Sequence, residues 1–175
     1  MRKAVAYIAC SLDGKIADKE GKVDWLDRVP HPENSDYGYK SFYESIDTTL
    51  MGATTYRDVL GFDVPFPYPD KTNYVITHDR NLKTLDSVTL VHDLSPEWMK
   101  DLKSQPGKDI WVVGGSFLNT WMIEHHFLDK LILFIMPVVL GEGIPLFTAG
   151  TGEVPGKLKE HKTYSSGVVE LHYEF

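Results

Sequence analysis

The sequence predicts a single α/β domain with a mostly parallel, mixed central sheet, helices on its flanks and an antiparallel hairpin at the C-terminal end. Short apolar runs alternate with segments of helical spacing as far as Leu128, and this alternation is typical of parallel β-α-β units. After that point the pattern changes to a long apolar run and a hairpin. With 175 residues, 42% of them hydrophobic, the chain can bury one core, so we expect one domain over residues 1–175.

Five apolar runs predict the strands of the parallel part of the sheet. Ala4–Cys10 is apolar at nearly every position, so we expect a strand that is buried on both faces and lies at the centre of the sheet. The remaining runs repeat this pattern and are Thr48–Met51, Thr72–Ile76, Val88–Val91 and Ile110–Val113.

Helical spacing occurs between these runs, in Tyr37–Ile46, Thr55–Leu60, Pro96–Leu102 and Phe117–His125. Beyond them, Leu131–Leu140 predicts a long strand in spite of Pro137. Leu158–Phe175 predicts a hairpin that turns at Ser165, Ser166 and Gly167. This hairpin adds an antiparallel edge to the parallel sheet.

Composition excludes several classes of protein. The 18 Lys and Arg against 25 Asp and Glu give a net charge of −7, which lacks the cationic surplus of a nucleic-acid binder. No apolar run approaches the roughly 20 residues of a membrane span, and the N-terminal apolar run is too short for a signal peptide. The single cysteine, Cys10, cannot form an internal disulfide, so we expect a cytoplasmic protein. The seven histidines lack metal-ligand spacing, so no metal site is expected.

Two places in the sequence suggest a binding or catalytic function. Gly114 and Gly115 follow a strand and precede a helix, where their amides can face a pyrophosphate at the positive end of the helix dipole, although turn chemistry alone also explains them. Asp36 is either a helix cap or a carboxylate at the mouth of a cleft lined by Trp25, Tyr37 and Phe42, where it would hold a polar heterocycle and partial burial could tune its pKa. The lack of a recognisable nucleophile fits hydride transfer, which needs orientation and electrostatics from the protein.

Four segments carry a resemblance to a known family. They are SLDGKIA (Ser11–Ala17), SIDTTLMGATTY (Ser45–Tyr56), IWVVGGSFL (Ile110–Leu118) and LILFIMPVVLGEGIPLF (Leu131–Phe147). Through them nearly the whole chain resembles the dihydrofolate reductase-like superfamily, particularly the C-terminal reductase domain of the bifunctional riboflavin biosynthesis deaminase-reductase. The resemblance implies the single-domain dihydrofolate reductase-like fold. It also implies a homodimer, to which the long strand Leu131–Leu140 would contribute unless it is buried inside one subunit.

The resemblance also implies roles for individual residues. Asp36 would be the catalytic residue, and a loop over Asp13–Trp25 would cover the nicotinamide. The implied cofactor-binding residues are Ala9, Ile16, Gly52, Thr54, Thr55, Thr77, His78, Val113, Gly114, Gly115 and Ser116. The implied substrate-binding residues are Trp25, Asp36, Tyr37, Lys40 and Phe134.

Three positions depart from the family. Ala53 stands where an arginine usually pairs with the 2′-phosphate of NADPH, so NADH remains an alternative cofactor, and Arg57 or Arg80 could replace that arginine. Phe134 replaces a threonine and Lys40 an aromatic residue of dihydrofolate reductases, which argues against dihydrofolate as the substrate.

Together these features predict an NAD(P)H-dependent reductase that transfers a hydride to a small heterocyclic or sugar-linked substrate. A narrower expectation is activity like that of 5-amino-6-(5-phosphoribosylamino)uracil reductase. Two alternatives stay open, namely a nucleotide-binding or partner-binding module without catalysis and a true dihydrofolate reductase.

Overall fold

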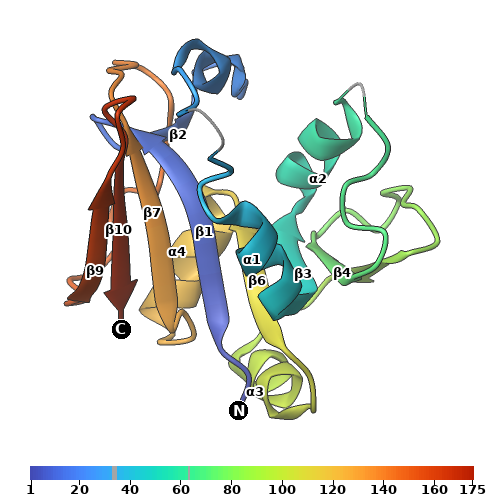
Figure 1. Ribbon diagram of the computed structural model, residues 1–175. Coiled ribbons are helices and arrows are strands. Elements are labelled where there is room, and N and C mark those ends of the chain that lie inside the picture. Colours follow the sequence, from blue (N-terminus) through green and yellow to red (C-terminus); the bar gives the residue numbers. More distant parts are fainter. Residues whose placement is uncertain (33–34, 63) are drawn as a thin grey trace.

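A computed structural model describes residues 1–32, 35–62 and 64–175. Its main feature is an eight-stranded sheet with the order β5-β4-β3-β6-β1-β7-β10-β9 (Figure 1). The strands are β1 (Ala4–Ser11), β3 (Ile46–Gly52), β4 (Thr72–Ile76), β5 (Val88–Val91), β6 (Asp109–Gly114), β7 (Lys130–Met136), β9 (Lys157–Thr163) and β10 (Val169–Glu174).

Strand direction follows the sequence prediction. All pairs from β5 to β7 are parallel, whereas β10 runs antiparallel to both β7 and β9. The central strand β1 is buried along most of its length, as its apolar run predicts. The expected α/β fold with a mixed sheet and a C-terminal hairpin is therefore confirmed.

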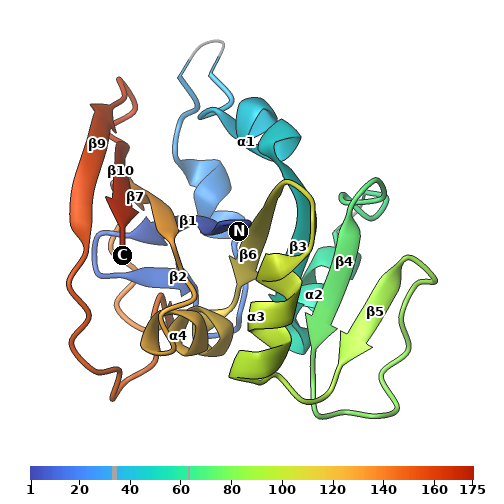
Figure 2. The same cartoon turned by 90° about the horizontal axis from the view of Figure 1, so that it is seen from below.

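Helices cover both faces of the sheet. They are α1 (Tyr39–Ser45), α2 (Ala53–Leu60), α3 (Pro96–Ser104) and α4 (Ser116–Glu124), with a 3₁₀ turn η1 over Asp24–Arg28. Phe42 of α1 and Tyr56 of α2 pack with Trp111 on one face, whereas Met99 of α3 and Met122 of α4 belong to the core on the other face. Figure 2 shows α1 on one side of the sheet and α3 and α4 on the opposite side.

Two predicted elements are shorter in the structure. The strand expected over Leu131–Leu140 ends at Met136, because Pro137 has no N–H for a ladder and the pairing with β10 ends at Ile135. The helix expected over Tyr37–Ile46 begins only at Tyr39. Its start is delayed because Tyr37 and Gly38 have φ values of 54° and 78°, outside the right-handed helical region.

A second, two-stranded sheet was not predicted. It pairs β2 (Lys15–Ala17) with β8 (Ile144–Pro145) in antiparallel direction. The carboxylate of Asp13 also accepts hydrogen bonds from the backbone N–H groups of Leu140 and Gly141, at 3.0 and 2.8 Å. The first part of the loop expected to cover the nicotinamide is thus tied to the segment after β7.

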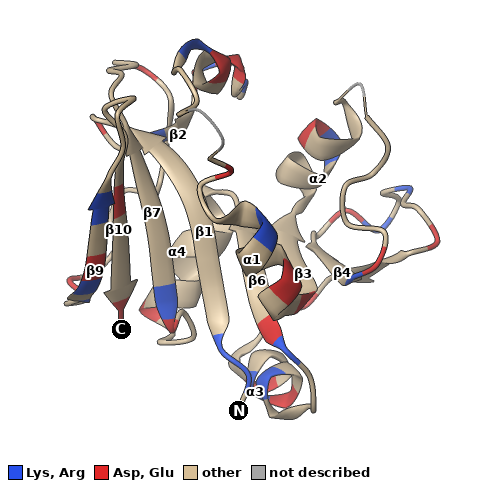
Figure 3. Cartoon of the chain, in the orientation of Figure 1, with Lys and Arg blue, Asp and Glu red and all other residues tan. Residues whose placement is uncertain are grey.

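Charged residues of both signs are interspersed on the side of the molecule drawn in Figure 3. In the part of the chain that the structure describes, no helix combines the length and the apolar character needed to cross a membrane.

Candidate functional site

The sheet opens between β1 and β6 towards the carboxyl ends of these strands. Their pairing stops at Ala6 and Val112, whereas β1 continues beside β7 as far as the pair Ser11–Met136. Figure 1 shows the carboxyl end of β1 leaning towards β7 and away from α2. Open α/β sheets bind ligands outside such carboxyl ends. Half-buried Ala9 lies on the part of β1 that has separated from β6.

Two helix N-termini meet beside this opening. Gly52 caps α2 and Gly115 caps α4, and among the described residues no side chain caps either helix. A Cβ on Gly115 would lie 3.5 Å from the Oγ1 of Thr55, so the first turns of the two helices are close neighbours. Their free amide N–H groups form a natural anion site.

Gly114 has a backbone conformation that requires glycine. Its φ is 114°, and a Cβ would lie 3.4 Å from the Oδ1 of the buried Asn119. The half-buried Val113 precedes it on β6. Ser116 donates its hydroxyl to the carbonyl of Pro145 and so fastens β8 to α4.

The other expected cofactor residues lie on α2, on β2 and after the end of β4. Thr54 is exposed on the first turn of α2, and Ile16 is half-buried on β2. At the end of β4, buried Thr77 accepts a hydrogen bond from the N–H of Asp79 at 3.1 Å, and His78 is exposed.

Arg57 is one of the two arginines considered as a replacement for the one missing at position 53. Its guanidinium lies 3.4 Å from the Asp79 carboxylate, in the turn that carries Thr77 and His78. Arg80 is exposed in the same turn. Arg57 therefore connects α2 with the turn after β4.

Asp36 is exposed, and its carboxylate accepts hydrogen bonds from the N–H groups of Gly38 and Lys40, at 2.9 and 3.0 Å. The N-cap residue of α1 is Gly38, and Asp36 precedes it: its carboxylate closes a turn to the Gly38 N–H and also binds one N–H of the first helical turn, that of Lys40. The bond from Lys40, followed by that from Gly38, lowers the pKa of Asp36. Hydrogen bonds, and not the partial burial expected from the sequence, are the main cause of this lowered pKa, and burial acts in the opposite direction. The side chain of Lys40 is exposed.

Tyr37 and Phe134, two expected substrate residues, are brought together by the fold. Their ring centroids lie 5.7 Å apart, and Tyr7 of β1 lies 4.7 Å from Phe134. Trp25 is only 4% exposed, and within the described residues its indole Nε1 has no hydrogen-bond partner. Trp25 therefore belongs to the core, and so does Phe134, which is also only 4% exposed.

The sequence analysis missed Tyr7, Tyr164, Glu170 and His172. The carboxylate of Glu170 accepts a hydrogen bond from the Tyr164 hydroxyl at 2.5 Å. Its other oxygen lies 2.5 Å from the Nε2 of His172. Burial, followed by the charge of Glu170, raises the pKa of Tyr7, and burial raises that of Tyr164. Tyr7 lies in an apolar run that predicts a buried core strand and no functional role. Tyr164, Glu170 and His172 lie in the hairpin, whose sequence predicts an edge of the sheet and no functional site.

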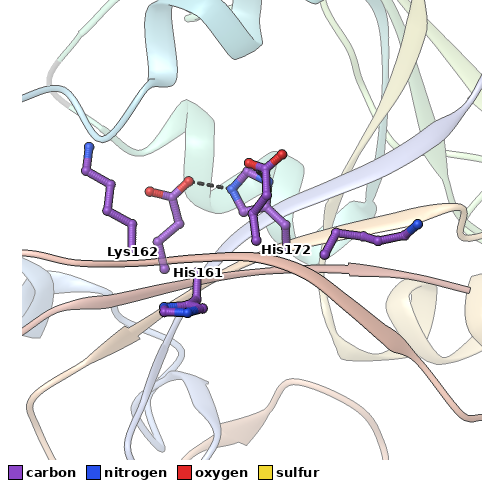
Figure 4. A pocket seen from close by; sticks show the side chains of 6 residues that line it. His161, Lys162 and His172 are labelled. Atoms are coloured by element: carbon purple, nitrogen blue, oxygen red, sulfur yellow. Dashed lines mark hydrogen bonds and ion pairs between the residues drawn. The ribbon is translucent and has the colours of Figure 1, made fainter.

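The hairpin side chains point to opposite sides of the sheet. Figure 4 shows Lys162 and His172 on one side and His161 on the other. They line a cavity of about 450 Å³ with Lys159, Glu160 and Glu170. A second cavity, of about 550 Å³, lies between Pro30, His31, Pro32 and the turn residues Ser165 and Ser166.

Metal and thiol chemistry find little support. Within the described residues, no group of three or more His, Cys, Asp or Glu side chains could hold a metal ion. Burial, followed by the charge of Asp13, raises the pKa of the Cys10 thiol to about 11, so this cysteine is protonated at neutral pH.

Comparison with known proteins identifies the family of this chain. Residues 2–170 match the family model described as the RibD C-terminal domain. YwjB of Bacillus subtilis (strain 168) is 40% identical over 172 residues, which are 98% of this chain and 97% of YwjB.

Two solved structures share the fold. A putative riboflavin biosynthesis protein from Shewanella sp. PV-4 has a TM-score of 0.87 and 28% identity, over 98% of each chain. A dihydrofolate reductase from Enterococcus faecalis, complexed with NADP(H), has a TM-score of 0.65 and 17% identity over 98% of this chain and 95% of that one. The chain has the dihydrofolate reductase-like fold and belongs to the RibD C-terminal domain family.

Proposed function

We propose that the chain is an NAD(P)H-dependent reductase that transfers a hydride to a C=N or C=O bond of a small heterocyclic or sugar-linked substrate. The observation that carries this proposal is the meeting of two uncapped helix N-termini, at Gly52 and Gly115, beside the opening between β1 and β6. Family membership and the NADP(H) complex of the Enterococcus faecalis enzyme support it.

The residues present fit a dinucleotide. A pyrophosphate can approach the amides at Gly114 and Gly115 because neither residue has a Cβ, and the positive ends of two helix dipoles favour its charge. In this proposal Ala9 and Ile16 flank the nicotinamide, which supplies the hydride when it is bound. Gly52, Thr54 and Thr55 face the same dinucleotide from the start of α2, and Thr77 and His78 lie beside its adenosine.

On the substrate side, Asp36 orients or polarises the substrate, and half-buried Tyr37 provides apolar ring surface, whereas Phe134 is as buried as Trp25 and supports Tyr37 from below the surface. A buried Phe134 cannot donate a hydrogen bond to a pterin as a threonine can, which disfavours dihydrofolate. A narrower version of the proposal is activity like that of 5-amino-6-(5-phosphoribosylamino)uracil reductase.

Calorimetry with NADPH and with NADH, followed by absorbance assays with candidate heterocycles, tests the proposal. We expect saturable binding of at least one dinucleotide and its oxidation in the presence of a substrate. Saturable binding without turnover on any candidate would favour a nucleotide-binding module. Tight binding of methotrexate would favour a true dihydrofolate reductase, and failure to bind either dinucleotide would overturn the proposal.

Cofactor preference rests on Arg57. With Ala53 at the start of α2, we propose that Arg57 reads the 2′-phosphate and makes NADPH the preferred cofactor. Arg57→Ala should then weaken NADPH binding and leave NADH binding unchanged. Equal affinity of the parent protein for both dinucleotides would contradict this preference.

A further inference from the structure

Tyr37 has a backbone conformation that is rare for a residue with a side chain. Its φ is 54°, in the left-handed region, where a bulky residue is an outlier held by its surroundings. Its carbonyl accepts a hydrogen bond from the Tyr7 hydroxyl at 2.9 Å, and its N–H donates to the Ser35 hydroxyl at 3.2 Å. Such outliers gather at functional sites.

The C-terminal hairpin provides the contacts on the other side of Tyr37. The ring of Tyr164 packs edge-on against the Tyr37 ring, with centroids 4.8 Å apart. The hydroxyl of Tyr37 lies 3.3 Å from the Oγ of Ser166 in the hairpin turn. Tyr37 is thus held between β1 and a segment about 130 residues later in the chain.

Tyr164 is itself held by Glu170. The Tyr164 hydroxyl donates to one carboxylate oxygen of Glu170, and the other oxygen lies 2.5 Å from the Nε2 of His172. The Glu170 side chain is only 13% exposed, and across the ladder it faces Phe134 of β7. A carboxylate with both oxygens engaged fixes the position of its donors.

Tyr37 lies in the chain between Asp36 and the two residues whose N–H groups bind its carboxylate. The carboxylate of Asp36 reaches past Tyr37 to the N–H groups of Gly38 and Lys40. A change in the backbone torsions of Tyr37 would move these two donors relative to the carboxylate, so the two hydrogen bonds depend on the conformation held at Tyr37.

We propose that Glu170 is a positioning residue for Asp36, acting through Tyr164 and the left-handed conformation of Tyr37. Its catalytic consequence rests on the proposed function, in which Asp36 contacts the substrate. The positioning itself involves neither substrate nor cofactor, so it can be measured independently of them.

The test is a titration of the Asp36 side-chain carboxyl by ¹³C NMR, with the resonance assigned by comparison with Asp36→Asn. In Glu170→Ala, we expect the pKa of Asp36 to rise towards the ordinary range of aspartate, because the hydrogen bonds from Gly38 and Lys40 are lost. A purely electrostatic effect has the opposite sign, since removing a nearby negative charge lowers a carboxyl pKa.

Three further variants complete the experiment. Tyr164→Phe keeps the ring but removes the hydroxyl that donates to Glu170, so it should shift Asp36 in the same direction as Glu170→Ala. Glu170→Gln keeps an oxygen that can accept from Tyr164, so the pKa of Asp36 should not rise in this variant. Glu174→Ala is the matched control, because Glu174 lies on the same strand and pairs with Lys159 instead, at 2.9 Å.

An unchanged or lowered Asp36 pKa in both Glu170→Ala and Tyr164→Phe would overturn the proposal. A rise in Glu174→Ala equal to that in Glu170→Ala would also overturn it, because the effect would then be general to the hairpin. If the protein binds no dinucleotide, the proposed function fails while the titration result stands. NADPH affinity should be equal in the parent protein and Glu170→Ala.

Discussion

At the scale of single residues, Asp36 combines a helix-capping geometry with exposure to solvent at the aromatic group around Tyr37. The capping contacts do not exclude contact with a substrate, because a carboxylate has lone pairs to accept further hydrogen bonds. The variant Asp36→Asn distinguishes a structural role of this residue from a role in binding the substrate.

Asp36→Asn should lower kcat/KM by roughly ten- to a hundredfold and leave NADPH affinity nearly unchanged. The loss of one charge-assisted hydrogen bond to the substrate costs about 1.5–3 kcal/mol. Asparagine is about as good a cap as aspartate, so the denaturation midpoint should change little. Steady-state kinetics and calorimetry measure these quantities. Equal kcat/KM in both proteins would leave Asp36 with a structural role alone.

Asp13 should make the stability of the chain depend on pH in the acid range. Hydrogen bonds from the Ser11 hydroxyl and then from the N–H groups of Leu140 and Gly141 lower its pKa to about 2, below the ordinary value of about 3.9. A depressed carboxyl pKa contributes stability that is present above the unfolded-state pKa and is lost as pH falls through the folded-state pKa.

Parent protein and Asp13→Asn should therefore differ in denaturation midpoint at pH 6 and converge between about pH 4 and pH 2. Urea denaturation at several pH values measures this difference. A gap between the two proteins that stays constant down to pH 2 would contradict the assignment.

At the scale of elements, the two helix N-termini can be tested through the glycine that caps α4. Gly115→Asp should abolish NADPH binding, because it places a carboxylate where pyrophosphate approaches the backbone amides. The fold should persist, since a Cβ at Gly115 meets only Thr55 at an ordinary 3.5 Å and φ is −72°. Calorimetry on folded protein, verified by circular dichroism, measures the effect.

Gly115→Ala is the control for this variant. It adds the Cβ without the charge and should weaken NADPH binding less than Gly115→Asp does. Undiminished affinity in Gly115→Asp would remove the glycine pair from the cofactor site.

Substitution of the neighbouring Gly114 should destabilise the fold, unlike substitution of Gly115. Gly114→Ala should destabilise the fold by more than about 1 kcal/mol, because alanine is strained at a φ of 114° and its Cβ would lie 3.4 Å from Asn119. Chemical denaturation compares it with Gly115→Ala, whose φ is ordinary. Equal stability of the two alanine variants would show that the left-handed conformation at Gly114 is not required.

At the scale of the whole molecule, the apolar run Leu131–Leu140 was expected to contribute to a homodimer unless it is buried inside one subunit. Both edges of β7 are paired, with β1 and β10, and Leu131, Phe134 and Met136 are buried within one chain. The alternative of burial inside one subunit thus holds for this strand. The outer edge of β9 has no strand partner among the described residues, and all seven of its residues are exposed.

The homodimer stays a prediction, now without a contribution from the edges of β7. Light scattering at tens of micromolar protein should give twice the 19.9 kDa mass of one chain. A monomer at this concentration would reject the dimer.

The sequence by itself determined the order and type of most elements of this protein. Thr72–Ile76 and Val88–Val91 coincide with β4 and β5 because short apolar runs between turn residues have few alternatives. The glycine pair after β6 was predictable for the same reason, since strand, glycines and helix are contiguous. The ends of elements that depend on backbone conformation could not be predicted from the sequence. The start of α1 after Tyr37 is an example.

Only the tertiary structure decided which distant side chains meet. No local pattern relates Tyr7, Tyr37 and Tyr164, yet three separate segments bring their rings and hydroxyls together. Glu170 belongs to the predicted edge hairpin, where no sequence feature marks it as buried, but its side chain is mostly buried and is paired across the ladder with Phe134. Periodicity reports which face of an element is apolar, whereas the partner of that face depends on strand order and register, which arise from the packing of the whole chain.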